Sequence, residues 1–237
     1  MEPSLSIAIE TSCRAGGVAL GRGDELVEAV DFDASLRHAV QLIPRLEELL
    51  RRHGATPPDL AEVFVSTGPG GFTGVRIGVV VARTLAQALP ALRCVAVPTP
   101  RAVAENARDA DWDRLAVVLD AKDDRVYTAT FLREAGRIVP AEPPAVRTER
   151  EFLAAVSRPV LLIGEGLRYH DLAAPGVTVA PADSPLHWPT AANVWRVGRR
   201  LASEGRYTEG SRLLPVYARR PEAVRLWENL GRPEGQA

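Results

Sequence analysis

The chain has 237 residues, of which 46% are apolar and 25% are charged, and its formal net charge at pH 7 is −1. These values are typical of an ordinary globular protein, and the balanced charge predicts no general attraction to nucleic acid or to anionic membranes. We expect neither a membrane-spanning helix nor a signal peptide, because no run of about 18 apolar residues appears and Met1–Ser4 leads into no signal-like apolar segment.

The first hundred residues predict the order β-β-β-α-β-α-β. Antiparallel strands followed by right-handed crossovers would form a mixed five-stranded sheet with helices on its faces. The expected strands are Leu5–Ile9, Gly17–Leu20, Leu26–Val30, Glu62–Ser66 and Leu92–Val97, and the expected helices are Ser35–Arg52 and Val75–Leu89. Ser35 is the expected N-cap of the first helix, and Gly54 ends it.

A glycine-rich loop joins the fourth strand to the second helix. It consists of Gly68, Pro69, Gly70, Gly71, Phe72, Thr73 and Gly74. Such a loop permits positive φ angles and a close approach of bare backbone, and the helix N-terminus behind it could hold an anion. The alternative is a tight structural turn with no ligand, because the loop matches neither GxxxxGK[ST] nor GxGxxG.

The helix expected at Ser35–Arg52 carries more apolar residues than one stripe can hold. One stripe can face the sheet, and the rest would stay exposed unless another element or another chain covers it. Leu42, Ile43 and Leu46 are the central candidates for such an interface; alternatively, all three belong to the core. Pro44 predicts a kink or a break, because it blocks the hydrogen bond to the carbonyl four residues earlier.

The second half echoes this order, which predicts an internally duplicated α/β fold with a cleft between two lobes. This is the ribonuclease-H-like architecture of actin-like ATPases and sugar kinases, with a mixed five-stranded sheet in each lobe. The expected elements are helix Arg101–Arg108, strands Leu115–Leu119 and Val126–Phe131, helix Thr148–Val156, strands Val160–Ile163 and Val177–Val179, and helix Ala191–Glu204, with a loop at Pro140–Pro144.

This reading divides the chain into three parts. We expect an N-terminal lobe at residues 1–100, a smaller C-terminal lobe at residues 101–212, and a tail at residues 213–237. The tail would begin as an extended segment, continue as a short helix at Pro221–Leu230, and pack back on the N-terminal lobe.

Six segments, in chain order, carry a family resemblance. The most specific is Gly68–Gly78, and the others are Ile7–Ser12, Arg37–Pro44, Leu119–Lys122 with Val126 and Tyr127, Ile163–Gly166 and Pro215–Arg219. Together they resemble the TsaB family, also called YeaZ, over nearly the whole chain. The resemblance implies an actin-like ATPase fold without a complete active site, in an accessory protein for threonylcarbamoyladenosine modification of tRNA beside the anticodon.

The resemblance also implies partners. A family member would be a cytoplasmic, non-catalytic scaffold that binds and stabilises the catalytic subunit TsaD, works with the ATPase TsaE and meets tRNA through the complex. Alone, it would form a homodimer. The first-lobe helices would form the shared interface, for which the candidate residues are His38, Leu42, Ile43, Leu46 and Arg76.

The resemblance further implies that the metal chemistry belongs to TsaD, which carries a His-x-x-x-His pair. The matching positions here are Thr99 and Val103, a hydroxyl and an alkyl group that cannot supply two imidazoles. We therefore expect no catalytic and no metal-binding residue in this chain. The remaining histidines, His53, His170 and His187, show no pair spacing or acidic partner pattern and are interpreted as surface or structural residues.

A degenerate nucleotide site for ATP or ADP stays open, although a scaffold would require no cofactor. The residues that could border a nucleotide are Glu10, Thr11, Ser12, Asp120, Gly164 and Gly166. Glu10 stands where the family commonly has Asp. The alternative function is therefore an ATPase or small-molecule kinase, in which Asp120 would hold Mg²⁺ or act as a base. Direct tRNA binding is the weaker hypothesis, because Glu204 and Glu209 dilute the basic face of Arg196, Arg199, Arg200 and Arg206.

Overall fold

Five strands form the first sheet, in the spatial order β3-β2-β1-β4-β5. They are β1 (Leu5–Glu10), β2 (Ala15–Arg22), β3 (Glu25–Asp33), β4 (Leu60–Gly68) and β5 (Arg93–Pro98). β1, β2 and β3 pair antiparallel, whereas β4 runs parallel to both β1 and β5. The computed structural model describes residues 4–33 and 38–219, and within them the expected mixed sheet is confirmed.

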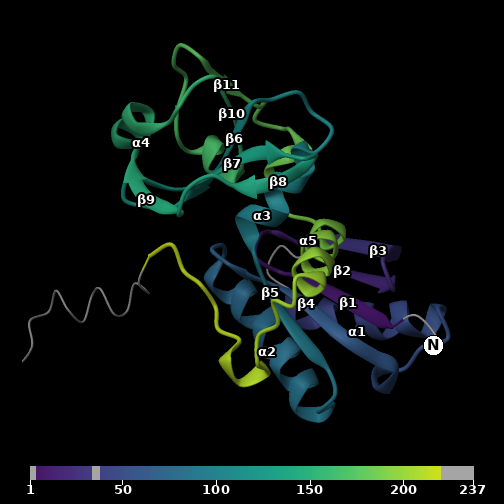
Figure 1. Ribbon diagram of the computed structural model, residues 1–237. Helices are drawn as coiled ribbons and strands as arrows, with labels where there is room; N and C mark the ends of the chain where they lie inside the picture. Colours follow the sequence, from purple (N-terminus) through teal and green to yellow (C-terminus); the bar gives the residue numbers. More distant parts are fainter. Residues whose placement is uncertain (1–3, 34–37, 220–237) are drawn as a thin grey trace, which may run out of the picture.

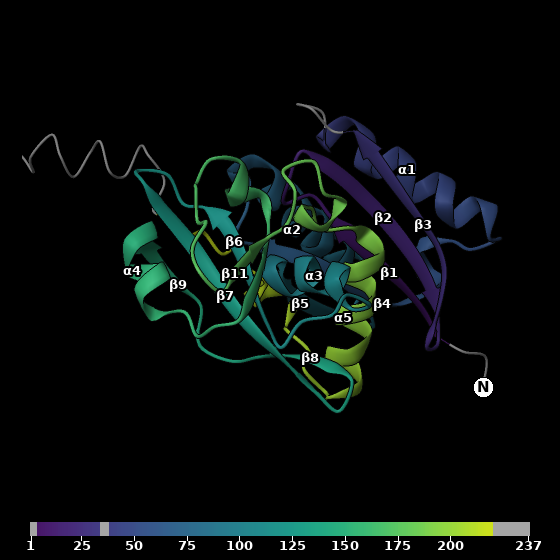
Figure 2. The same ribbon diagram turned by 90° about the horizontal axis from the view of Figure 1, so that it is seen from above.

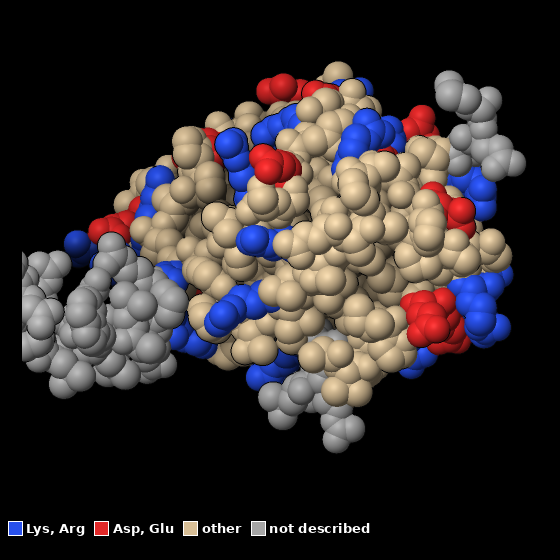
Figure 3. Space-filling model, turned by 90° about the horizontal axis from the view of Figure 1, so that it is seen from below, with Lys and Arg blue, Asp and Glu red and all other residues tan. Residues whose placement is uncertain are grey.

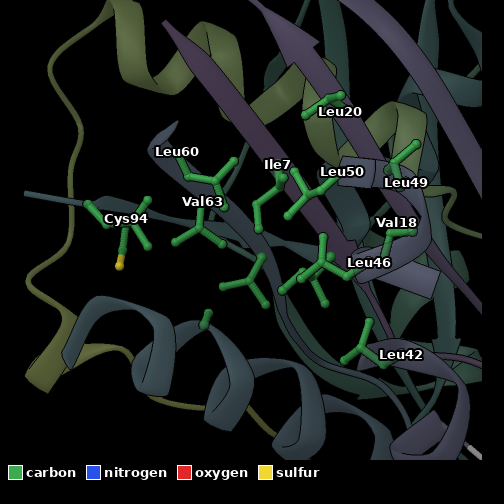
Figure 4. Close-up of a cluster of buried hydrophobic side chains, with 14 of the residues drawn as sticks. Ile7, Val18, Leu20, Leu42, Leu46, Leu49, Leu50, Leu60, Val63 and Cys94 are labelled. Carbon is green, nitrogen blue, oxygen red and sulfur yellow. The ribbon is translucent and has the colours of Figure 1, made fainter. Parts of the chain in front are cut away.

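Helices α1 (His38–Arg52) and α2 (Phe72–Ala88) cover one face of the first sheet. Side chains alternate along a strand, so Ile7 of β1 and Val63 of β4 point to the same face of the sheet and share one core cluster with the leucines of α1 (Figure 4). α1 runs through Pro44 as a single helix, so the break that this proline could cause is absent. Ser35, the expected N-cap, lies outside the described residues.

The opposite face of the first sheet is covered by α5 (Ala191–Ser203), which comes from the far end of the chain. The Trp195 indole N–H donates to the Ser6 hydroxyl at 2.9 Å. Gly198 lets the helix approach closely, because a Cβ at this position would lie 2.3 Å from the Phe64 side chain. Burial of these rings secures α5 to the sheet, since apolar area removed from water stabilises by about 25 cal/mol per Å².

The second sheet has the order β11-β10-β6-β7-β8, and β9 pairs with the other half of β7. Its strands are β6 (Arg114–Asp120), β7 (Arg125–Glu134), β8 (Arg137–Pro140), β9 (Ala145–Thr148), β10 (Val160–Ile163) and β11 (Val177–Val179). β6, β10 and β11 are parallel, and the other pairings are antiparallel. The five-stranded path confirms the duplicated architecture, and β9 adds a sixth strand. β8 and β9 were not predicted; they flank the proline-rich loop.

The two sheets form two stacked lobes, with α3 (Thr99–Ala104) at their junction (Figure 1). α4 (Glu149–Ala155) packs on the second lobe. Short 3₁₀ helices complete the structure: η1 (Pro57–Asp59), η2 (Glu105–Ala107), η3 (Glu165–Arg168), η4 (Pro185–His187) and η5 (Gly210–Arg212). Within the described part of the chain, no helix has the length and apolar character needed to cross a membrane.

The chain returns to the first lobe earlier than expected. We expected α5 within a C-terminal lobe at residues 101–212, but it packs on the first sheet beside α3 (Figure 2). An amphipathic pattern shows that a helix has an apolar face, but not which sheet that face covers. After α5, Leu213 enters the first-lobe core and the Val216 N–H donates to the Thr67 carbonyl at 2.7 Å. The helix expected at Pro221–Leu230 lies outside the described residues.

Candidate functional site

A groove of about 420 Å³ lies between α1 and α2 on the first lobe. Three apolar side chains stand exposed in or beside it: Val40 is 67% exposed, Ile43 49% and Val80 58%. These helices lie at the bottom of the molecule in Figure 1, and the view from below shows that uncharged atoms occupy most of the centre of this face (Figure 3). The groove lining is mostly apolar, and exposed apolar side chains gathered in one groove are typical of a protein-binding site.

Two of the three central interface candidates are core residues, which corrects the sequence-based choice. Leu42 is fully buried and Leu46 is 5% exposed, and both pack in the first-lobe core. They share a stripe with Leu49 at three- and four-residue spacing, whereas Ile43 is turned about 100° away from Leu42. Ile43 is therefore the member of the trio on the surface, and Leu42 only backs the groove.

The other two interface candidates lie at the ends of the helices. His38 begins α1, and its side chain is outside the described residues. Arg76 of α2 is exposed and lines both the helix groove and the cleft between the lobes. Its guanidinium carbon lies 5.1 Å from the centroid of the Phe72 ring, in a cation–π contact.

The glycine loop is held by backbone contacts on both sides. The Gly71 N–H donates to the Ser12 carbonyl at 2.7 Å, and a Cβ on Gly70 would lie 2.3 Å from the same oxygen. Gly68 has a φ of +98°, and a Cβ there would lie 2.3 Å from the Val216 carbonyl oxygen. Any larger residue would separate these segments, so the loop fixes the first turn and the C-terminal segment against the start of α2.

The cleft between the lobes consists of two adjoining hollows, of about 700 and 800 Å³. Both are lined by the glycine loop and by Glu165 and Tyr169, which were not predicted from the sequence. Thr11 and Ser12 line the larger hollow, and Asp120 lines the smaller one. The cleft thus brings together three of the six residues that were expected to border a nucleotide.

Glu10, at the end of β1, does not line either hollow. Its side chain is 1% exposed, and one carboxylate oxygen accepts hydrogen bonds from the Ser12 N–H and from the Ser12 hydroxyl, the latter at 2.6 Å. The second oxygen has no partner among the described residues. Burial raises the pKa of Glu10 to about 7, although the bonds from Ser12 oppose this rise.

Asp120 lies at the start of a chain of polar contacts in the second lobe. Its Oδ2 pairs with the Lys122 ammonium, and its Oδ1 accepts the Lys122 N–H at 2.8 Å. His170 Nε2 lies 3.4 Å from the same Oδ1. Burial would raise the pKa of Asp120, but the bonds from Lys122 and His170 outweigh it and lower the pKa. His170 Nδ1 lies 2.7 Å from a Glu149 oxygen. His170 therefore has two acidic partners, which the sequence pattern did not reveal because both come from distant parts of the chain.

Gly164 and Gly166 hold η3 against β6. A Cβ on Gly164 would lie 2.2 Å from the Val118 carbonyl oxygen, and one on Gly166 would lie 2.8 Å from the Leu119 carbonyl carbon. This close packing carries Glu165, between the two glycines, into the cleft, where it accepts the Asp120 N–H at 3.2 Å. Burial raises the pKa of Glu165. A carboxylate flanked by two glycines at a strand end was the signal that could have identified it.

Thr99 and Val103 lie on α3 and are buried. The Thr99 hydroxyl has no hydrogen-bond partner among the described residues, and Thr99 lines the larger hollow. Within residues 4–33 and 38–219, no three His, Cys, Asp or Glu side chains are grouped as metal ligands would be. The Thr99 position therefore places a hydroxyl beside the cleft, and the Val103 position places an alkyl group in the core.

Comparisons with known proteins agree with this architecture. A family described as "TsaD: tRNA N6-adenosine threonylcarbamoyltransferase" matches residues 32–181, more than half of the chain. The TsaB protein of Bacillus subtilis is 33% identical over 167 residues, 69% of this chain and 72% of that relative. Escherichia coli TsaB is 28% identical over 232 residues, 94% of this chain and 97% of its own length.

A solved structure gives the same result for the fold. A Pseudomonas aeruginosa protein, described as similar to the peptidase YeaZ, superposes with a TM-score of 0.80 at 26% identity, covering 91% of this chain and 100% of that one. Two lobes, each with a mixed sheet flanked by helices, around a central cleft form the actin-like fold. Among proteins of that fold, the chain belongs to the TsaB family, also called YeaZ.

Proposed function

We propose that the chain is a non-catalytic scaffold subunit in the biosynthesis of threonylcarbamoyladenosine in tRNA. It binds and stabilises the catalytic subunit TsaD, works with the ATPase TsaE in the cytoplasm, and meets tRNA through the complex. The relatives from B. subtilis and E. coli are named tRNA threonylcarbamoyladenosine biosynthesis proteins, which supports the pathway. Residues 32–181 match a TsaD family model, so this chain and TsaD have similar folds. This similarity supports a complex between the two proteins.

The observation that carries this proposal is the apolar groove between α1 and α2. Ile43 and Val80 stand half exposed on neighbouring helices, with the buried Leu42 behind them. The core of an interface is poorer in charge than the remaining surface, and its fully buried centre supplies most of the binding energy. We propose that, in the isolated chain, the same groove binds a second copy, so that a homodimer needs no further surface.

Thr99 and Val103 support the non-catalytic part of the proposal. A hydroxyl and an alkyl side chain cannot bind a metal ion as two imidazoles do.

The non-catalytic assignment is tested by a threonylcarbamoylation assay with purified components. Modified tRNA should form only when TsaD is present, and this chain should raise the yield of a TsaD reaction that it cannot perform alone. Product formation by this chain without TsaD would refute the non-catalytic assignment.

The interface is tested by a double substitution, Ile43→Asp with Val80→Asp, which introduces two charges without touching the core. Binding to TsaD should weaken by more than about thirtyfold, since hot-spot losses exceed about 2 kcal/mol. Val179→Asp is the matched control, because Val179 is 38% exposed on β11 in the second lobe. Calorimetry would measure the affinity, and sedimentation would show whether the variant is a monomer. Unchanged TsaD binding by a folded double variant would show that the interface lies elsewhere on the chain.

A second candidate function, nucleotide binding in the cleft, rests on a separate observation. The hydroxyls of Thr11 and Thr99 are buried without partners among the described residues, and both threonines line the 800 Å³ hollow. Buried polar atoms normally have a hydrogen-bond partner, so a bound ATP or ADP would satisfy them. Under this hypothesis, Asp120 would hold Mg²⁺ or act as a base.

The nucleotide hypothesis is tested by titration with a fluorescent ATP analogue and by steady-state ATP hydrolysis. The expected result is binding that Thr11→Val weakens and hydrolysis that Asp120→Ala abolishes. If Thr11→Val leaves binding unchanged, the orphan hydroxyl has no role. The absence of any binding by the wild-type chain would reject the hypothesis, while leaving the scaffold proposal intact.

A further inference from the structure

A third hollow, of about 410 Å³, lies where the two lobes meet, and it shares no lining residue with the cleft or the helix groove. Three segments build it: the start of α3, the middle of β7, and the link at residues 140–144 between β8 and β9. The link runs along the edge of the second lobe (Figure 2). We refer to this hollow as the junction groove.

The walls of the junction groove are apolar and stiff. Five prolines contribute to the lining, together with the rings of Tyr127 and Phe131. Proline has a fixed φ and loses little conformational freedom when a partner binds. Grooves lined by aromatic rings and rigid backbone commonly receive extended peptide segments. The shape and stiffness of the walls therefore suit an extended chain with an apolar side chain.

The junction groove also contains a cation that lacks a partner. Arg101 is half buried, and it makes no hydrogen bond or ion pair to any described residue, whereas its neighbour Arg200 is paired with Glu105 at 2.8 Å. Burial lowers the pKa of Arg101, and the like charges of Arg206 and Arg200 lower it further, whereas the charge of Glu204, too far away to form an ion pair, opposes the shift. Withdrawing an unpaired charge from water is costly unless an opposite charge meets it.

A second polar group in the same lining is also unsatisfied. The Thr130 hydroxyl is buried and has no partner among the described residues, although the Thr130 carbonyl accepts the Ala141 N–H at 2.8 Å. Arg101 and Thr130 come from different lobes, and both contribute atoms to the lining of the hollow. The junction groove thus combines an apolar wall with the guanidinium of Arg101.

We propose that the junction groove binds an acidic peptide segment of a protein partner. An apolar side chain of the peptide packs between the prolines and the rings, and an adjacent Asp or Glu carboxylate pairs with Arg101. A carboxylate fits the planar guanidinium as a bidentate partner. This proposal is independent of the scaffold function proposed above, because it uses none of the residues of the α1–α2 groove.

A nucleic-acid backbone fits the junction groove less well. Binding to nucleic acid requires several cations along the phosphates, and within the lining of this groove only Arg101 is basic. The exposed carboxylate of Glu142 lines the same hollow and would repel a polyanion. A peptide needs only one carboxylate, which pairs with the Arg101 guanidinium, and its neighbouring apolar side chain occupies the wall. Glu142 then stays in water.

The test uses the full chain and two capped peptides, acetyl-Pro-Leu-Asp-Asp-amide and acetyl-Pro-Leu-Asn-Asn-amide. Amide resonances of ¹⁵N-labelled protein report binding at Arg101, Tyr127 and Thr130. The acidic peptide should shift these resonances and bind at least about tenfold tighter than its amide counterpart, as expected for a charge-assisted hydrogen bond. Arg101→Gln should abolish this preference, and Arg206→Gln, with the same change of net charge, should keep it.

Thermal unfolding supplies a readout that does not require a peptide. If Arg101 has no partner in the free chain, Arg101→Gln should unfold at the wild-type temperature or above it. Arg101→Lys is the conservative variant, and it should retain part of the preference for the acidic peptide.

Four results would overturn the proposal. They are no shifts at about 5 mM peptide, equal affinity for both peptides, a clear loss of thermal stability in Arg101→Gln, or stronger shifts of the same resonances by an anticodon stem–loop RNA than by the acidic peptide.

Discussion

Burial of Glu10 makes the stability of this protein depend on pH. The pKa of this carboxyl rises from its ordinary value of 4.5 to about 7, because burial disfavours the charged form. The folded state therefore keeps the proton to a higher pH than the unfolded state. Below about pH 4.5 both states are protonated, and the stability linked to Glu10 is fully present. As pH rises through 7 that stability is lost, and the total loss is about 3 kcal/mol.

Glu10→Gln isolates this effect, because an amide resembles the protonated carboxyl and does not titrate. Urea unfolding of both proteins between about pH 5 and pH 8 gives the difference in the free energy of unfolding at each pH. This difference should shift in favour of the Gln variant by about 3 kcal/mol as pH rises. Glu25→Gln, at an exposed position of β3, is the control and should show no comparable shift. A difference that stays constant with pH would refute the reasoning.

Three further predictions concern packing and polar contacts. Gly198→Val should cost about 2–3 kcal/mol in unfolding free energy, because the new side chain would collide with Phe64; a smaller cost would mean that α5 can move. Leu42→Ala should cost about 3 kcal/mol through a core cavity, whereas Ile43→Ala should cost less than about 1 kcal/mol; equal costs would contradict the assigned orientation of α1. His170→Ala should cost about 1–2 kcal/mol near pH 7, because it removes contacts with two carboxylates; urea unfolding measures each of these changes.

Local patterns in the sequence were sufficient for most of the fold. Alternating apolar residues predicted β1, and glycine followed by a helical run placed α2 after β4, because these signals depend only on neighbours in the chain. β8 and β9 escaped prediction, since each has four residues and Pro140 ends the first of them. The strand pairing of such short segments is decided by the neighbouring β7, not by their own composition.

The orientation of α1 shows a second limit of prediction from sequence. An over-wide apolar surface identified this helix as a candidate interface, but the pattern could not say which residues would meet the sheet. The contact with β2 and β3 buries Leu42 and Leu46, and it leaves Val40 and Ile43 exposed. Successive residues of a helix are about 100° apart around its axis. A one-residue error in the predicted buried face therefore assigns surface residues to the core and core residues to the surface.

The candidate sites could be predicted only in part, because their polar contacts join distant segments. Asp120 and the glycines at 164 and 166 were identified from their positions at strand ends. The contacts of His170 with Glu149 and Asp120 span 21 and 50 residues of sequence. The junction groove depends on three segments and on the absence of a partner for Arg101 in the described chain. Neither feature leaves a periodic signal in the sequence.

The return of α5 to the first sheet has a consequence for biosynthesis. The second lobe is inserted into the first, so the N-terminal sheet cannot bury both faces until α5 has been made, at Ser203. A ribosome must therefore release about 200 residues before the first lobe can close, although domains commonly fold in order from the N-terminus. During that interval Phe64 and its neighbours stay open to water. The second lobe, whose strands are contiguous in sequence, is the part able to fold first, and a nascent chain would expose its N-terminal half to chaperones for longest.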